Sequence, residues 1–202
     1  MDLSPTVIDL RETAAQPWKN GAGLTREIAI GPVDATFADF DWRISVAEIA
    51  RDAPFSAFPG IDRCIVLLQG RGMQLCSEDG AIDVRLDTPY EPFRFSGEVP
   101  MRASLIEGGC IDFNVMVRRS KWRADVIENS GAGNIELAPA SFVYCVRGGV
   151  TIYADAMPTT NLREGQGALW RCGAPPRKAR AQTVDTRFIL VQLHELCQDE
   201  VP

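Results

Sequence analysis

Short apolar runs separated by turn residues dominate the pattern of hydrophobic and polar positions along this chain. The runs are rich in Val, Ile, Phe and Trp, and Gly, Pro and Asp interrupt them at intervals. No long segment repeats its apolar residues every 3.6 positions, as an amphipathic helix would. The pattern therefore predicts an all-β protein. The clearest expected strands are residues 42–47, 64–68, 113–117, 141–146 and 187–193.

The two halves of the chain repeat one order of strands and turns. Each half reads as strand, glycine turn, strand, proline turn and strand, with Gly70 in the first half and Gly148-Gly149 in the second. Two such antiparallel units each bury one apolar face and close their sheet edges. We therefore expect a duplicated β-barrel or sandwich, divided into residues 1–119 and 120–202 and packed as one unit. Trp122 at the joint indicates packing there rather than a free linker.

Length and charge narrow the function classes. The 202 residues suffice for one sizeable core or two small, closely packed ones. A net charge of −6 and a pI of about 4.9 provide no positive field for a phosphate backbone or an anionic membrane. Neither nucleic acid nor membrane is an expected partner. The densest basic stretch, residues 176–180, is interpreted as a solvated loop.

The start of the chain and the cysteines indicate a cytoplasmic protein. Residues 1–5 are not a basic segment followed by an apolar stretch, and no window reaches the 18 apolar residues of a membrane span. The six cysteines are scattered without a C-x-x-C pair, and several lie in apolar runs. We expect reduced, mostly buried thiols that act as small hydrophobic residues.

The single histidine, His194, removes most metal and catalytic machinery from consideration. A site built from several imidazoles and a carboxylate cannot form, and no Asp-rich calcium loop is present. A carboxylate-only site for Mg²⁺ or Ca²⁺ stays open on this count, but without such a loop we expect neither a metal nor a cofactor. His194 alternates with the apolar residues of the last expected strand and is interpreted as a structural histidine.

Polar residues alternate with apolar ones in several expected strands. Two interpretations are open. These faces are the solvated side of antiparallel sheets, or they line a barrel interior shaped for a small anionic or zwitterionic ligand, since Arg binds carboxylates with paired hydrogen bonds. The alternating sets are Thr25, Glu27 and Ala29 against Arg26, Ile28 and Ile30; Arg43, Ser45 and Ala47; and Asp112, Asn114, Met116 and Arg118.

A further arginine ends a dense loop. Pro59 and Gly60 predict a turn within residues 55–63. This places Arg63 at the mouth of a buried strand, where a surface pair with Asp62 is the ordinary interpretation.

Five stretches of the first 119 residues resemble the bicupin family that contains HutD and Ves, in the family's order. The part from Arg123 onward is similar only in its general strand pattern, and Ala22 stands where many members have a third glycine. The five stretches are residues 18–28 (WKNGAGLTREI), 42–47 (WRISVA), 54–63 (PFSAFPGIDR), 67–72 (LLQGRG) and 112–119 (DFNVMVRR).

The resemblance implies two cupin-like (RmlC-like) antiparallel β-barrels in one chain, without the usual metal centre. It also implies a regulator linked to histidine utilisation, sensing an intermediate such as formylglutamate or urocanate in the HutD branch, or a stress-responsive protein in the Ves branch. The motif positions coincide with the polar ones, so the implied ligand-binding residues are Lys19, Asn20, Thr25, Glu27, Arg43, Ser45, Arg63, Asp112 and Asn114.

Each type of side chain suggests a role toward the ligand. Arg43 and Arg63 are expected to hold carboxylates. Amide or hydroxyl groups of the ligand are expected to meet Asn20, Thr25 and Asn114. An ammonium or N–H group is expected to meet Glu27 or Asp112.

Three functions follow from these residues. The leading one is a non-enzymatic, metabolite-binding regulator, for which a homodimer is the expected assembly. The second is a metal-independent isomerase or lyase acting on a small carboxylic acid, with Glu27 or Asp112 as general base opposite an arginine. The third is a purely protein-binding role.

Overall fold

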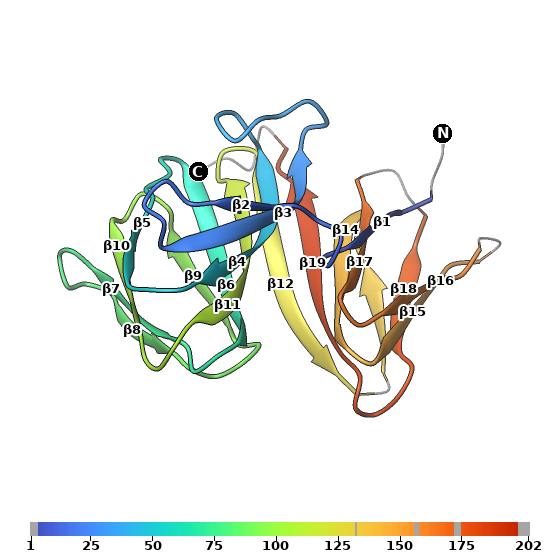
Figure 1. The fold of residues 1–202 in the computed structure, drawn as a ribbon. Coiled ribbons are helices and arrows are strands. Elements are labelled where there is room, and N and C mark those ends of the chain that lie inside the picture. The colour runs from blue at the N-terminus through green and yellow to red at the C-terminus, as the bar shows by residue number, and fades with distance from the viewer. Residues whose placement is uncertain (1–3, 132, 156–157, 172–174, 198–202) are drawn as a thin grey trace. The chain divides into compact units, whose positions relative to one another are not determined.

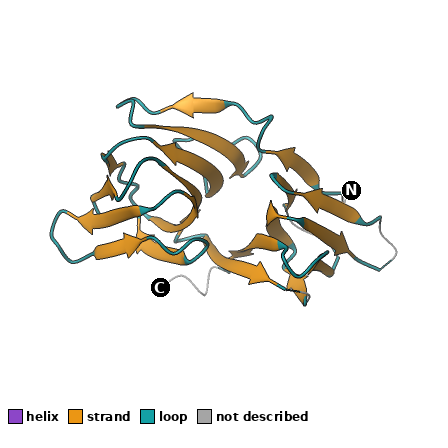
Figure 2. Cartoon of the chain, turned by 60° about the horizontal axis from the view of Figure 1, so that its bottom comes forward, coloured by secondary structure: helices purple, strands orange, loops and turns teal. Residues whose placement is uncertain are grey.

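The computed structural model describes residues 4–131, 133–155, 158–171 and 175–197. These residues form the strands β1 to β19 and no helix (Figures 1 and 2). The predicted all-β class is therefore confirmed. It follows that no described segment is a helix long and apolar enough to cross a membrane.

The chain divides into two compact units. The N-terminal unit contains residues 14–122 with residues 196 and 197, and the C-terminal unit contains residues 4–13 and 123–195. In both units the strands form two antiparallel sheets, and no sheet of the described residues closes into a barrel.

The N-terminal unit has a six-stranded sheet in the order β2-β3-β4-β11-β6-β9 and a four-stranded sheet in the order β5-β10-β7-β8. Figure 1 shows β3, β4, β11 and β6 side by side. The strands are β2 (Ala15–Pro17), β3 (Gly23–Gly31), β4 (Trp42–Ile49), β5 (Ala53–Phe55), β6 (Ile61–Gln69), β7 (Met73–Ser77), β8 (Asp83–Leu86), β9 (Pro92–Ser96), β10 (Met101–Leu105) and β11 (Cys110–Arg118).

The C-terminal unit has a five-stranded sheet in the order β1-β17-β14-β19-β12 and a four-stranded sheet in the order β13-β18-β15-β16. The strands are β1 (Thr6–Asp9), β12 (Trp122–Ser130), β13 (Asn134–Leu137), β14 (Ala140–Arg147), β15 (Gly149–Tyr153), β16 (Thr160–Arg163), β17 (Gln166–Trp170), β18 (Arg177–Ala181) and β19 (Arg187–Glu195).

The first strand of the chain belongs to the sheet of the C-terminal unit. β1 pairs antiparallel with β17. Asp9 fixes this edge, because its carboxylate accepts hydrogen bonds from Arg11 Nε at 2.9 Å and Gln166 Nε2 at 3.4 Å. The pattern of apolar runs contained no sign of this exchange, which depends on pairing between residues far apart in the sequence.

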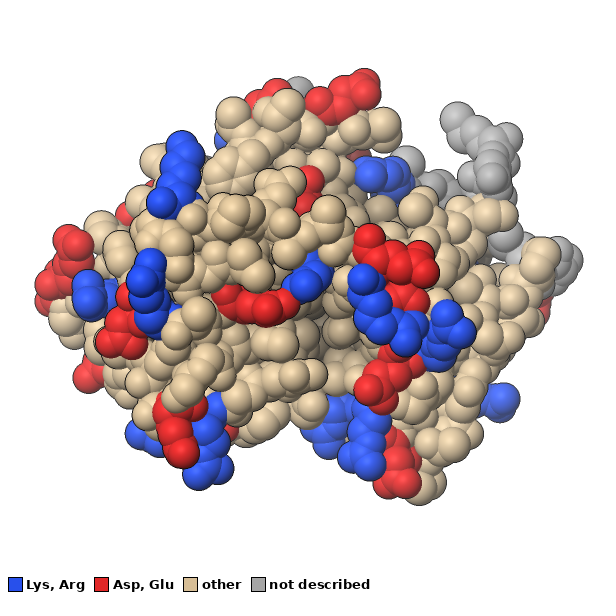
Figure 3. Space-filling view, viewed as in Figure 1, with Lys and Arg blue, Asp and Glu red and all other residues tan. Residues whose placement is uncertain are grey.

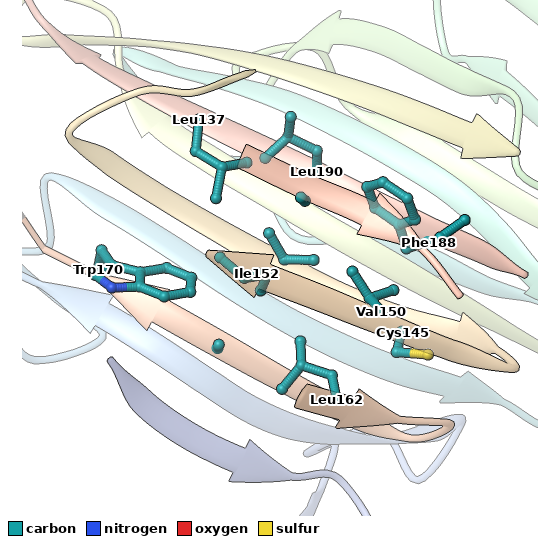
Figure 4. Close-up of a cluster of buried hydrophobic side chains, with 12 residues drawn as sticks. Leu137, Cys145, Val150, Ile152, Leu162, Trp170, Phe188 and Leu190 are labelled. Atoms are coloured by element: carbon teal, nitrogen blue, oxygen red, sulfur yellow. The ribbon is translucent and has the colours of Figure 1, made fainter. Parts of the chain in front are cut away.

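The core of each unit lies between its two sheets. In the C-terminal unit, inward residues of β14, β15, β17 and β19 pack together with Leu137 and Leu162 (Figure 4). In the N-terminal unit, Ile65 and Leu67 of β6 pack with Met73 and other inward residues of β7 and β10. Apolar residues at every second position of a strand place one face of each sheet against the other.

The described cysteines are free thiols, and most are buried. Cys64, Cys110 and Cys145 are buried, Cys76 is half-buried and Cys197 is exposed. Burial raises the pKa of Cys64 and of Cys145 to about 11, so these thiols are neutral at physiological pH. Cys172 lies outside the described residues.

The basic stretch around residue 177 is a strand, so its interpretation as a solvated loop is wrong. In β18, Arg177 and Ala179 are buried, while Lys178 and Arg180 are exposed. The alternation of two faces in a strand explains the difference. Charge density alone does not reveal it.

Two glycines of the N-terminal unit have a positive φ but differ in the space around them, and substitutions at both positions show how closely the chain packs there. Gly72 has φ +87°, and a Cβ there would lie 1.9 Å from the carbonyl oxygen of Leu86. Gly80 has φ +72° but open space around it. We expect Gly80→Ala to lower the free energy of unfolding by about 1–2 kcal/mol, the cost of the left-handed backbone. Gly72→Ala should lower it by about 3 kcal/mol or more.

Urea denaturation of the two variants and the wild type measures both changes. Gly80→Ala is the matched control, because it carries the same backbone strain without the clash. Equal losses in the two variants would contradict the close approach of Gly72 to β8.

Candidate functional site

The polar residues of β4 and β11 face the interior of the N-terminal unit. Asp112 lies opposite Ala47 on β4 and Leu67 on β6, and directly opposite residues share one face of a sheet. Leu67 belongs to the core between the two sheets. Ser45, Asp112 and Asn114 are 2%, 0% and 7% exposed. The interpretation of these faces as solvated is therefore wrong for β4 and β11.

Six polar residues form one layer between apolar groups. Along β11, Cys110 belongs to the core cluster and Met116 to a second cluster with Phe40 and Ile61, and the polar residues lie between these two positions. Arg43 and Arg63 both lie opposite Met116 in the register of the sheet. We call this set the polar layer; its members are Glu27, Arg43, Ser45, Arg63, Asp112 and Asn114.

Arg43 is held by neighbours on two strands. Its Nε donates to Oε2 of Glu27 on β3 at 2.8 Å, and its Nη1 donates to Oγ of Ser45 at 3.4 Å. The Arg43 side chain is 10% exposed and that of Glu27 is 36% exposed. Glu27 is thus a point at which solvent reaches the polar layer.

Arg63 is joined to Asp112 through an amide. Arg63 Nη2 donates to Asn114 Oδ1 at 3.0 Å, and Asn114 Nδ2 donates to Asp112 Oδ1. Within the described part of the chain, Asp112 Oδ2 and Arg63 Nε are buried and have no hydrogen-bond partner. Buried polar atoms are nearly always paired, so a water, an ion or a ligand is the expected partner of unpaired ones in a native structure.

The charges in the polar layer influence one another. Burial raises the pKa of Asp112 to about 7, against the opposing effects of the Arg63 charge and of the hydrogen bond from Asn114. The pKa of Arg63 is lowered to about 10, mainly by burial; the charge of Asp112 opposes this shift, and the nearby charge of Arg43 adds to it. Two neighbouring guanidinium groups repel each other, and an anion bound between them relieves that repulsion.

Aromatic rings contact both arginines, three of them at Arg63. The Cζ atom of Arg63 lies 5.0 Å from the ring centre of Phe95, 5.2 Å from that of Phe55 and 5.7 Å from that of Phe58. Such contacts fix a guanidinium group without neutralising its charge.

Phe37 covers Arg43 from the loop between β3 and β4. Its ring centre lies 5.0 Å from Arg43 Cζ, and 56% of the residue is exposed. The sequence analysis missed Phe37. The available signal was two phenylalanines, Phe37 and Phe40, in a short loop that is otherwise small and polar.

Two of the expected site residues, Asn20 and Thr25, have structural contacts near the first turn. Asn20 Oδ1 accepts a hydrogen bond from the backbone N–H of Ala22 at 3.0 Å, and Thr25 Oγ1 accepts one from Trp18 Nε1 at 2.7 Å. Thr25 lies opposite Ala47, on the polar face of the sheet. Lys19 and Asn20 are exposed, and the contacts described for Asn20 lie in this turn and with Arg51 rather than in the polar layer.

A β-bulge breaks the alternation expected for residues 25–30. Glu27 lies opposite Ser45, but Ala29 lies opposite Ile44 and Ile30 opposite Arg43. Ile30, not Ala29, therefore shares the register row of the polar layer. One extra residue in a strand shifts every later side chain to the other face.

Two other expectations can be compared with the structure. Asp62 does not pair with Arg63; its Oδ1 accepts a hydrogen bond from Arg119 Nε at 2.8 Å, because neighbouring residues of a strand point to opposite faces. His194 Nε2 lies 3.1 Å from Asp125 Oδ2 in the C-terminal unit.

Two further properties of the described residues concern metal ligands and surface charge. Those residues contain no group of three or more His, Cys, Asp and Glu residues that could hold a metal ion. Acidic and basic side chains are interspersed on the face shown in Figure 3.

A hollow of about 430 Å³ lies in the C-terminal unit beside Gly148 and Gly149. Its amide side chains bond to their neighbours. Gln182 Nε2 donates to Thr151 Oγ1 at 3.1 Å, and Gln166 Oε1 accepts from the backbone N–H of Arg163 at 3.2 Å. These two amide groups already have hydrogen-bond partners within the protein, whereas the polar layer contains buried polar atoms without one.

Comparison with known proteins gives the family and the fold. The HutD family matches residues 10–190 of the chain. The protein Ves of Cronobacter sakazakii is 35% identical over 167 residues, which cover 82% of this chain and 87% of that protein.

Solved structures agree with this match. A conserved protein of unknown function from Pseudomonas aeruginosa is 27% identical with a TM-score of 0.83, covering 94% of this chain and 98% of that one. HutD from Pseudomonas fluorescens is 26% identical with a TM-score of 0.82, covering 96% and 100%.

A more distant likeness concerns the fold alone. A cupin 2 conserved barrel domain protein from Leptotrichia buccalis has a TM-score of 0.60 at 11% identity, covering 95% of this chain and 97% of that one. The β fold is thus cupin-like, and by its match over residues 10–190 the chain belongs to the HutD family.

Proposed function

We propose that this chain is a non-enzymatic regulator of the HutD and Ves type that binds a small carboxylate in the polar layer. The observation that carries the proposal is the pair of inward-facing arginines, Arg43 and Arg63, beside unpaired buried polar atoms. Arginine binds carboxylates through charge-assisted hydrogen bonds. A buried layer of this kind costs stability unless a ligand completes it.

The finer arrangement belongs to the same proposal. Each unit is a cupin-like barrel formed by its two sheets, and the ligand enters the N-terminal one past Glu27 and Phe37. Arg43 and Arg63 hold carboxylate groups, and Asn114 meets an amide or hydroxyl group. Asp112 Oδ2, which has no partner among the described residues, accepts an N–H or O–H group.

The ligand class follows from these groups. A compound with a carboxylate and an N–H donor fits them. Formylglutamate has an N–H on the carbon that carries its α-carboxylate, and urocanate has an imidazole N–H at a greater distance from its carboxylate. The link to histidine utilisation or to a stress response rests on family membership.

A prediction about ligand affinity concerns Arg43. Arg43→Ala should weaken the binding of formylglutamate or urocanate about 10- to 100-fold, because it removes a charge-assisted hydrogen bond. The midpoint of unfolding without ligand should stay close to that of the wild type. Calorimetric titration measures the affinities.

The matched control for Arg43 is Arg94→Ala. Arg94 is an exposed arginine on β9 in the same sheet, next to the inward Phe95. Its loss removes the same charge from the outer side and should leave affinity unchanged. If Arg43→Ala binds as tightly as the wild type, the assignment of the polar layer is wrong.

One observation favours a second candidate function, a metal-independent isomerase or lyase. The pKa of Asp112 is raised to about 7, which suits a general base at neutral pH. Arg63, linked to Asp112 through Asn114, would stabilise an enolate formed beside it.

Turnover separates the two functions. A regulator returns the bound compound unchanged, and this is the outcome we expect when NMR follows a compound that binds. An enzyme would convert the compound, and Asp112→Asn would slow the conversion about 100-fold or more while keeping affinity. Conversion by the wild type that Asp112→Asn loses would replace the leading proposal.

A further prediction concerns pH and stability. The pKa of Asp112 in the folded protein, about 7, lies above its usual value of 3.8, so the folded state favours the neutral carboxyl. The stability that this group contributes is complete below pH 3.8 and is lost as pH rises through 7. We expect a loss of up to about 4 kcal/mol between these limits.

Asp112→Asn isolates this contribution. The variant keeps an oxygen that can accept from Asn114 but cannot ionise. The stability difference between Asp112→Asn and the wild type should shift in favour of the variant as pH rises from 5 to 8, measured by urea denaturation. A difference that stays constant with pH would show that Asp112 titrates below this range.

A further inference from the structure

Arg177 lies at the end of the core of the C-terminal unit. On β18 it shares the inward face with Ala179 and Ala181, which belong to that core. Arg177 is 4% exposed. Ser141 of β14 is fully buried and alternates into the same interior as Val143. An arginine thus takes a position where the pattern of the strand continues the apolar core.

The contacts of Arg177 leave much of its guanidinium unmatched. Nη2 donates to the carbonyl oxygens of Ala138 at 3.0 Å and Pro139 at 3.3 Å, and lies 3.4 Å from Ser141 Oγ. The Cζ atom lies 4.6 Å from the centre of a Trp170 ring. Nε and Nη1 are buried and have no hydrogen-bond partner in the part of the chain that the structure describes.

Arg177 differs in its electrostatics from Arg43, the other arginine that is fully buried. Arg43 has Glu27 at 2.8 Å, whereas no ion pair with Arg177 is found among the described residues. Burial lowers the pKa of Arg177, and no charge among the described residues raises it. A buried charge without a counter-ion is costly, and carbonyl dipoles or water offset only part of that cost.

We propose that Arg177, Ser141 and Trp170 form a binding site for one small singly charged anion, a carboxylate or a halide, inside the C-terminal unit. The anion accepts hydrogen bonds from Nε or Nη1, away from the two carbonyl oxygens that Nη2 already contacts. Ser141 accepts from Nη2 and keeps its own proton as a donor. The ring of Trp170 holds the guanidinium in place.

A single negative charge matches the single uncompensated positive charge. This site is separate from the polar layer, since all its residues belong to the other unit. It therefore does not depend on the proposed function.

Crystals of the full chain grown with sodium bromide test the site directly. We expect an anomalous bromide peak within about 3.5 Å of the Arg177 guanidinium, the range of a hydrogen bond to a large anion. Formate replacing bromide should give planar density at the same place. Water alone at this position, or no density, would overturn the proposal, and this wild-type result needs no variant.

Solution measurements complete the test. At constant ionic strength, saturating formate should raise the midpoint of thermal unfolding by about 5 °C in the wild type. The rise should persist in Arg180→Met, which removes an exposed arginine from the outer face of the same strand. In Arg177→Met the rise in the midpoint with formate should be clearly smaller than in the wild type, because the proposed site is lost.

An Arg43→Ala background separates the two anion sites. If the bromide peak and the Arg177-dependent rise remain in that background, the Arg177 site stands whatever happens to the polar layer. An equal rise in Arg177→Met and the wild type would show that the anion binds elsewhere, and Arg177 would then only anchor residues 138–141 to β18.

Discussion

A charged side chain buried between two sheets needs a partner, and the organisation of this protein depends on how that need is met. In the N-terminal unit, Arg43 meets it with Glu27 at 2.8 Å, while Arg63 meets it with an amide and aromatic rings. In the C-terminal unit, Arg177 has carbonyl oxygens and a tryptophan. These three sets of partners leave different amounts of positive charge uncompensated. The two units therefore differ in the ligand that their buried arginines can bind, although both are pairs of sheets.

The all-β class could be predicted from the sequence because apolar alternation and turn residues are local signals. The direction of the polar faces could not. Arg43 and Ser45 alternate with apolar residues in the same way whether their face meets water or a second sheet. Only the burial of Ser45 and Asp112 decides between the two. Nothing local indicated the pairing of β1 with β17 either.

The candidate site could be predicted in part. The family resemblance indicated Arg43, Arg63 and Asn114, and the structure brings them into one layer. It could not show that Asn20 would bond within its own turn. Phe37 lies outside the matching stretches, and its importance comes from its 5.0 Å contact with Arg43. The inward orientation of the Arg177 side chain could not be predicted, because a run of basic residues is typical of a solvated surface.

Asn114 is the residue through which the N-terminal site keeps its capacity to bind. A direct ion pair between Arg63 and Asp112 would neutralise both charges and leave little for a ligand. Asn114 accepts from Arg63 and donates to Asp112, so it joins the two without cancelling either. One oxygen of Asp112 and the Nε of Arg63 then remain without a partner among the described residues. A carboxylate with an adjacent N–H donor supplies both missing partners at once, which a simple anion cannot do.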